Sequence, residues 1–131
     1  MSQTNKIIVL YDAYCVLCNK SIIWIIKNDV NNFFSFAHYK GNFSKINYPE
    51  LTKIDTISII TKKGDYLQKS EAVLYILDVI NKLTFIQKII KVIPVKTRDL
   101  IYDKIAKNRY SLFGKYSTCE IPKPEWKSKF L

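Results

Sequence analysis

Two cysteines, Cys15 and Cys18, stand three positions apart in the segment LYDAYCVLCNKSIIWIIKND, residues 10–29. The segment passes from an apolar run into a helical pattern, so we expect the pair at the N-terminus of a helix. Unpaired backbone N–H groups and the positive end of the helix dipole stabilise a thiolate at that position. The spacing favours thiol-disulfide exchange, in which Cys15 attacks a substrate disulfide and Cys18 resolves the mixed disulfide.

Asp12 precedes the first cysteine by three residues. Its carboxylate could take the proton of Cys18 during resolution, if burial raises its pKa. It could also cap the turn or the helix, as Asp commonly does. The two roles are compatible, although an ionised carboxylate close to Cys15 would oppose formation of a thiolate.

A cysteine pair at this spacing also forms half of a four-ligand zinc site. The other candidate ligands are Cys119, His38 and carboxylates, which do not make the second paired motif that structural zinc sites use. Metal binding is therefore a less favoured alternative, as is a pair of buried structural thiols. A lone histidine such as His38 more often packs through a hydrogen bond than serves as a ligand or base.

The composition is that of one globular domain: 131 residues, 48% hydrophobic and 24% charged. A formal charge of +10 results from 21 Lys and Arg against 11 Asp and Glu. The lysines are scattered and carry no nucleic-acid-binding signature, which favours a solvated basic surface and no nucleic-acid partner.

The apolar runs are short. The longest after the N-terminal strand is IIWII at 22–26, far below the roughly 18 residues that span a bilayer. The first residues lack the apolar core of a secretory signal. We therefore expect a cytoplasmic protein without an integral membrane segment, where a close cysteine pair is more often catalytic or metal-binding than a structural staple.

The hydrophobic patterns in the first two thirds of the chain predict an α/β domain. The apolar run at 6–11 predicts a buried strand, the spacing of isoleucines predicts a helix over 16–28, and FFSFAHY predicts a parallel strand over 33–39. A loop or short helix over 40–55 precedes a hairpin of strands 56–61 and 65–69. A helix over 70–83 completes a core of residues 1–83.

Residues 84–131 are expected to form a helical extension of the same domain. A helix is predicted up to Pro94 and a longer one over 96–113 before Gly114, followed by an irregular tail. The stripe FIQKIIKVI with its lysines could lie on an anionic membrane, but a core-facing helix gives the same pattern and is favoured.

The segment YDAYCVLC, residues 11–18, resembles the N-terminal Asp-x-x-Cys-x-x-Cys signature of the DCC family of thiol-disulfide oxidoreductases. AKNRYSLFGKYSTCEIP is similar to that family's Asn-Arg-Tyr-x-x-Phe-Gly segment followed by a cysteine, and KKGDYLQKSEAVLYIL to its central turn, strand and helix. The resemblance implies a thioredoxin-like fold with additional C-terminal helices. It places Asp12, Cys15 and Cys18 at the active site, and its second motif comprises Asn108, Arg109, Tyr110, Phe113, Gly114 and Cys119.

Two positions depart from the pattern. Ala13 replaces the family's glycine, so a turn with positive φ would be less comfortable before Cys15. Thioredoxin-like enzymes also have a cis-proline before the third strand, where this chain has KIDTISII. A non-proline cis bond costs about 2.5 to 4 kcal/mol, so we expect a trans peptide near Asp55 and a differently shaped substrate groove.

Several residues admit two interpretations. Arg109 and Tyr110 could close over the cysteines, where an arginine would stabilise a thiolate, or they could bind helix carbonyls and fill the core. Cys119 could be a third redox thiol, but a packed or exposed cysteine is favoured. Three apolar residues around the pair, Tyr14, Val16 and Leu17, could form a rim for a substrate or belong to the core.

The leading hypothesis is a disulfide-reducing or disulfide-exchanging enzyme that acts on a disulfide-containing protein or a small thiol substrate. The cysteine pair itself carries two electrons and no Gly-rich phosphate loop is present, so no cofactor is expected. A separate electron donor is then required. The alternative is a non-enzymatic binding module, in which the cysteines hold a metal or pack and the basic surface binds an acidic partner.

Overall fold

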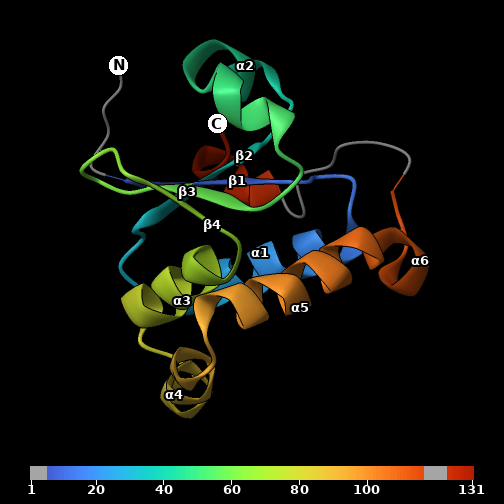
Figure 1. The fold of residues 1–131 in the computed structure, drawn as a ribbon. Helices are drawn as coiled ribbons and strands as arrows, with labels where there is room; N and C mark the ends of the chain where they lie inside the picture. Colours follow the sequence, from blue (N-terminus) through green and yellow to red (C-terminus); the bar gives the residue numbers. More distant parts are fainter. Residues whose placement is uncertain (1–5, 117–123) are drawn as a thin grey trace.

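The computed structural model describes residues 6–116 and 124–131, which form a four-stranded mixed sheet with helices on both faces (Figure 1). The strand order is β2-β1-β3-β4, with β1 (Ile7–Tyr11), β2 (Phe34–His38), β3 (Ser58–Ile60) and β4 (Tyr66–Gln68). β1 and β2 are parallel, and the other two pairs are antiparallel. The expected strand-helix-strand unit and hairpin are confirmed, and the mixed α/β architecture is consistent with a thioredoxin-like fold.

The helices of the described residues are α1 (Val16–Asn28), α2 (Asn42–Asn47), α3 (Lys69–Ile80), α4 (Thr84–Val92), α5 (Val95–Lys107) and α6 (Arg109–Phe113), with 3₁₀ helices at Pro49–Lys53 and Pro124–Lys129. In Figure 1, α1, α3 and α5 lie on one side of the sheet and α2 lies on the other. The proposed boundary between core and extension falls between α3 and α4.

The first strand forms the centre of the core because it is buried along its whole length. Ile7, Val9 and Tyr11 pack in the cluster that includes Ile22 and Ile25 of α1. The alternate residues of the strand pack in a second cluster on the opposite face, as the two-residue period of a strand requires. The apolar run at 6–11 therefore predicted a central strand correctly.

Three expectations about element lengths are wrong. The third strand has three residues instead of six, because the N–H of Ile57 and the hydroxyl of Thr56 bond to the hydroxyl of Tyr102 on α5. The helix expected over 96–113 is divided at Asn108 into α5, in which no residue is buried, and α6, which begins with the buried Arg109. The tail, expected to be irregular, forms the second 3₁₀ helix at Pro124–Lys129, and its residues 117–123 lie outside the described part of the chain.

The expectation that α4 faces the core is also wrong. Its one buried residue is the polar Gln87, whose side-chain amide donates to the carbonyl of Lys82. Phe85 is 72% exposed and Val92 is 79% exposed. The apolar stripe that the sequence shows is therefore a surface feature of the protein.

None of the helices within 6–116 and 124–131 has both the length and the apolar character needed to cross a bilayer. All peptide bonds between described residues are trans, which confirms the expectation for the bonds near Asp55.

Candidate functional site

The cysteine pair lies where β1 leads into α1, as the sequence predicts. Cys15 is the N-cap residue of α1, and its Sγ accepts the backbone N–H of Cys18 at 3.3 Å. Both cysteines are free thiols, but they differ in exposure. Cys15 is 0% exposed, whereas Cys18 is partly exposed.

The environment of Cys18 opposes its ionisation. Burial raises the pKa of the Cys18 thiol, and the neighbouring Cys15 sulfur raises it further through a hydrogen bond and through its charge, although the positive charge of Arg109 lowers it. Cys18 therefore keeps its proton at neutral pH. A resolving thiol requires this state until the first exchange step is complete.

Asp12 is buried, with 6% of its surface exposed. One carboxylate oxygen accepts the N–H of Tyr14 at 2.9 Å, and the other accepts hydrogen bonds from Arg109 at 3.0 Å and from the hydroxyl of Tyr110. Burial acts to raise the pKa of Asp12, but these hydrogen bonds and the arginine charge outweigh it and hold the pKa below its usual value. The turn-capping role is thus confirmed, and the expectation of a raised pKa is wrong.

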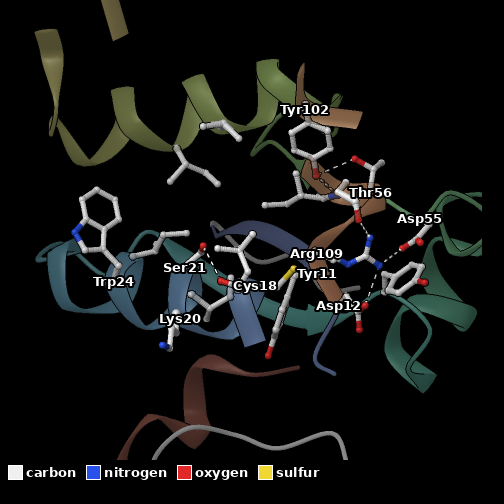
Figure 2. A pocket seen from close by; sticks show the side chains of 18 of the residues that line it. Tyr11, Asp12, Cys18, Lys20, Ser21, Trp24, Asp55, Thr56, Tyr102 and Arg109 are labelled. Atoms are coloured by element: carbon white, nitrogen blue, oxygen red, sulfur yellow. Dashed lines mark hydrogen bonds and ion pairs between the residues drawn. The ribbon is translucent and has the colours of Figure 1, made fainter. Parts of the chain in front are cut away.

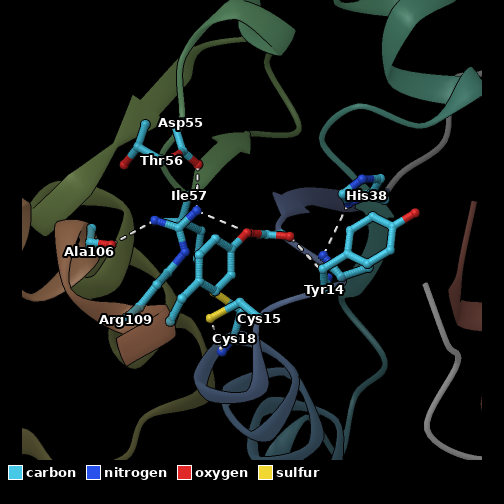
Figure 3. A network of polar contacts seen from close by, with 12 residues as sticks. Tyr14, Cys15, Cys18, His38, Asp55, Thr56, Ile57, Ala106 and Arg109 are labelled. Carbon is cyan, nitrogen blue, oxygen red and sulfur yellow. Dashed lines mark hydrogen bonds and ion pairs between the residues drawn. The ribbon is translucent and has the colours of Figure 1, made fainter. Parts of the chain in front are cut away.

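The guanidinium of Arg109 joins three parts of the chain, as Figure 3 shows. It donates to the carbonyl of Ala106 at 2.7 Å, to Asp55 at 2.6 Å and to Asp12 at 3.0 Å. Burial would lower its pKa, but the two carboxylates raise it above the ordinary value, so Arg109 is a fixed positive charge. The interpretation as a helix-terminal arginine that binds a carbonyl is confirmed, and the bond to Asp12 also brings the residue to the turn before the cysteines.

The residues that follow α6 lie over Cys15. Lys115 forms a β-bridge with Cys15, the N–H of Val16 donates to the carbonyl of Gly114 at 3.3 Å, and the N–H of Tyr116 donates to the carbonyl of Tyr14 at 2.7 Å. We call Gly114–Tyr116 the covering segment. Gly114 has φ 96° and ψ 173°, a backbone conformation that residues with a side chain rarely adopt.

Asn19 is a residue of the site that the sequence reasoning missed. It is 4% exposed, and its side-chain amide donates to the carbonyls of Ala13 at 2.7 Å and Cys15 at 2.9 Å. It thereby fixes the turn that carries the first cysteine. The sequence carries no clear signal for this role, because Asn19 is followed by the polar Lys20 and Ser21. Ala13 itself adopts no positive φ, so the turn tolerates a side chain where the family usually has glycine.

Replacing Asn19 with Ala is expected to lower the free energy of unfolding by about 1 to 3 kcal/mol, because two buried carbonyls lose a donor. Urea denaturation followed by circular dichroism measures this loss. Asn28→Ala is the matched control, since Asn28 bonds to the carbonyl of Trp24 on the exposed side of the same helix. An equal effect of both substitutions would show that Asn19 does not hold the turn.

His38 packs beside the same turn. Its Nδ1 accepts the N–H of Ala13 at 3.1 Å, and its ring lies edge-on to Tyr14 at 5.2 Å (Figure 3). Burial lowers the pKa of His38. The interpretation as a hydrogen-bonded packing residue is confirmed. The proposed rim residues Tyr14, Val16 and Leu17 are each half-buried.

A cavity of about 490 Å³ lies between α1, α3 and α5, and Cys18 lines it. Figure 2 shows Trp24 at one end, Asp12, Asp55 and Arg109 at the other, and Cys18 between them. Most of the wall consists of aliphatic and aromatic side chains. The cavity therefore has a charged cluster at one end and a thiol in its middle, within an otherwise apolar wall.

Within the part of the chain that the structure describes, no group of three or more His, Cys, Asp or Glu side chains lies together as a metal site requires. Cys119, the third cysteine of the sequence, lies outside the described residues.

Comparison with known proteins places these features in a family. The chain is 30% identical to the uncharacterized protein YuxK of Bacillus subtilis (strain 168), in an alignment that covers 98% of this chain and 96% of the relative. It is also 30% identical to a chloroplastic DCC family protein of Arabidopsis thaliana, over 91% of this chain and 72% of the relative. No solved structure gives a significant match. The sequence of residues 9–115 matches the family model of the DCC1-like thiol-disulfide oxidoreductases, so the chain belongs to this family.

Proposed function

We propose that the protein is a thiol-disulfide oxidoreductase whose cysteine pair alternates between two thiols and one disulfide. The observation that carries the proposal is the position of Cys15, at the N-cap of α1 with its Sγ accepting the N–H of Cys18 at 3.3 Å. A thiolate at this position is stabilised by the helix terminus, and its partner lies one turn away. The family match supports the same chemistry.

In the proposed reducing direction, the thiolate of Cys15 attacks one sulfur of a substrate disulfide. The substrate S–S bond breaks, a mixed disulfide with Cys15 forms, and the leaving thiolate takes up a proton. Cys18 then loses its proton and attacks the Cys15 sulfur, which releases the second substrate thiol and leaves a Cys15–Cys18 disulfide. A separate thiol donor returns two electrons to the pair. A cytoplasmic location, which we propose from the sequence, supplies such donors.

In this scheme Asp12 acts by positioning other side chains. Its lowered pKa makes it a weak proton acceptor, so its proposed role is to hold Arg109 and Tyr110 against the cysteine turn. Arg109 adds a positive charge that favours the ionised form of Cys18 when that thiol must react. Because Cys15 is fully buried, the covering segment must also move before a disulfide from solvent can reach it.

A redox titration tests the proposed function. Metal-free protein is equilibrated in glutathione or dithiothreitol buffers, alkylated, and mapped by peptide mass at all three cysteines. We expect reversible formation of a Cys15–Cys18 disulfide with a potential of about −120 to −270 mV. Cys18→Ser is the control that removes the intramolecular disulfide. A pair that stays unreactive, or that only links molecules together, would favour the non-enzymatic binding module.

A further inference from the structure

The two sulfurs of the pair face different surroundings. Cys18 lines the cavity between α1, α3 and α5, whereas Cys15 is 0% exposed and does not line it. A molecule inside the cavity therefore meets the Cys18 sulfur. The exposed residues Lys20, Ser21 and Asp55 also line the cavity, so it communicates with solvent.

The walls of the cavity suit an apolar molecule. They include Ile22, Ile25, Ile57, Ile76, Leu77 and the side of Trp24. A volume of about 490 Å³ lies within the range of small-molecule sites. An apolar wall of this kind gives little binding energy to a charged peptide such as glutathione, because the charges would lose their hydration.

The end of the cavity that contains Arg109 carries a positive charge. Arg109 lines the cavity and is 7% exposed. Its Nε is the buried side-chain polar atom that has no hydrogen-bond partner among the described residues. This N–H is enclosed by protein atoms, so a molecule in the cavity meets the positive charge of the guanidinium, which favours a thiolate sulfur.

We propose that this cavity binds a small dithiol on a neutral apolar body, together with the disulfide that the dithiol forms. This inference rests on the proposed function and names the chemical class of the thiol donor that returns two electrons to the pair. The apolar body lies along the walls of α1 and α3, and the sulfur-bearing end lies between Cys18 and Arg109.

The reaction starts from the Cys15–Cys18 disulfide. One substrate thiolate attacks the Cys18 sulfur, the Cys15–Cys18 bond breaks, and Cys15 leaves as a thiolate that the helix terminus stabilises. The second substrate thiolate then attacks the substrate sulfur bonded to Cys18. A substrate disulfide forms, and Cys18 leaves and takes up a proton. The substrate loses two electrons and the pair gains them; the second substrate proton passes to Cys15 or to water. The substrate disulfide of the proposed function then reoxidises the pair by reaction with Cys15.

A single-turnover experiment with the oxidised, full-length protein tests the proposal. Dihydrolipoamide is the probe because it is a dithiol on an aliphatic body, and dithiothreitol is the matched polar dithiol. Acid quench, alkylation and peptide mass measure the rate at which each reduces the Cys15–Cys18 disulfide. We expect a rate with dihydrolipoamide that saturates and that exceeds the dithiothreitol rate about ten-fold at low concentration, as burial of a few methylene groups predicts.

Two substitutions fill the cavity from different walls: Val73→Phe on α3 and Ala106→Leu on α5. Each is expected to bring the ratio of the two rates close to one. Val30→Phe is the control, because Val30 is 88% exposed and lies outside the cavity. The cavity inference is overturned if the disulfide forms but both dithiols reduce it at the same rate in every variant, and if that rate rises linearly with dithiol concentration. The proposed function would then still stand. If no Cys15–Cys18 disulfide forms, the proposed function fails as well.

Discussion

Gly114→Ala is expected to make Cys15 react with iodoacetamide about five-fold faster or more than in the unchanged protein. Cys15 is 0% exposed, so the reagent reaches it only when the covering segment separates from Tyr14–Val16. At φ 96° and ψ 173° a side chain costs about 1 to 3 kcal/mol. A Cβ at this position would meet Val16 at 3.5 Å, an ordinary contact, so the cost is conformational. It raises the fraction of open molecules, and the reaction rate follows that fraction.

Gly64→Ala is the matched control for this experiment. Gly64 also has a positive φ, of 93°, and has open space around its Cα, but it lies in the β3–β4 hairpin. Its substitution should strain the backbone without freeing Cys15. Peptide mass mapping separates the alkylation of Cys15 from that of the more exposed Cys18. Equal Cys15 rates in both variants and the unchanged protein would show that the covering segment does not control access.

Asp12→Asn is expected to lower the free energy of unfolding at pH 7 by about 2 to 4 kcal/mol. The substitution keeps the shape of the side chain but removes the negative charge that pairs with Arg109. The arginine is only 7% exposed, so water cannot replace the lost partner. Breaking a buried ion pair on one side costs about 3 to 5 kcal/mol. We expect somewhat less here because Asp55 remains bonded to the guanidinium. Urea denaturation at pH 7 measures the difference.

The effect of Asp12→Asn should depend on pH in a defined direction. The pKa of Asp12 is lower in the folded protein than its ordinary value, so its contribution to stability is fully present above the unfolded pKa of about 4. That contribution is lost as the pH falls through the folded pKa. The difference between the two proteins should therefore shrink in acid. Asp78→Asn, at an exposed position of α3, should show no such dependence. A difference that stays constant from pH 7 into strong acid would rule out the ion pair as its cause.

The local elements near the cysteines could be predicted from the sequence because short-range patterns determine them. A β-branched apolar run gave β1, the spacing of isoleucines gave α1, and Lys63 and Gly64 marked the hairpin. Cys15 was expected at the helix N-terminus, and it is the N-cap. Each of these features depends on neighbours a few positions away.

The extension could be predicted only in part. The stripe of α4 has the same spacing whether it faces a core or solvent, and the exposure of Phe85 and Val92 follows from where α3 and α5 pack. The break between α5 and α6 at Asn108 has no strong sequence signal. It occurs where Arg109 turns inward toward two carboxylates that precede it by 97 and 54 positions.

The sequence by itself determined the cysteine pair, its place between a strand and a helix, and the family motifs at the two ends of the chain. Only the tertiary structure decided that Asp12 is held ionised by Arg109 and Tyr110, that Cys15 is buried and pairs with the covering segment, and that Cys18 faces an apolar cavity. The reason is physical. A thiol's pKa, exposure and reach depend on side chains that approach from distant parts of the chain, and the local pattern of residues does not specify which of them meet.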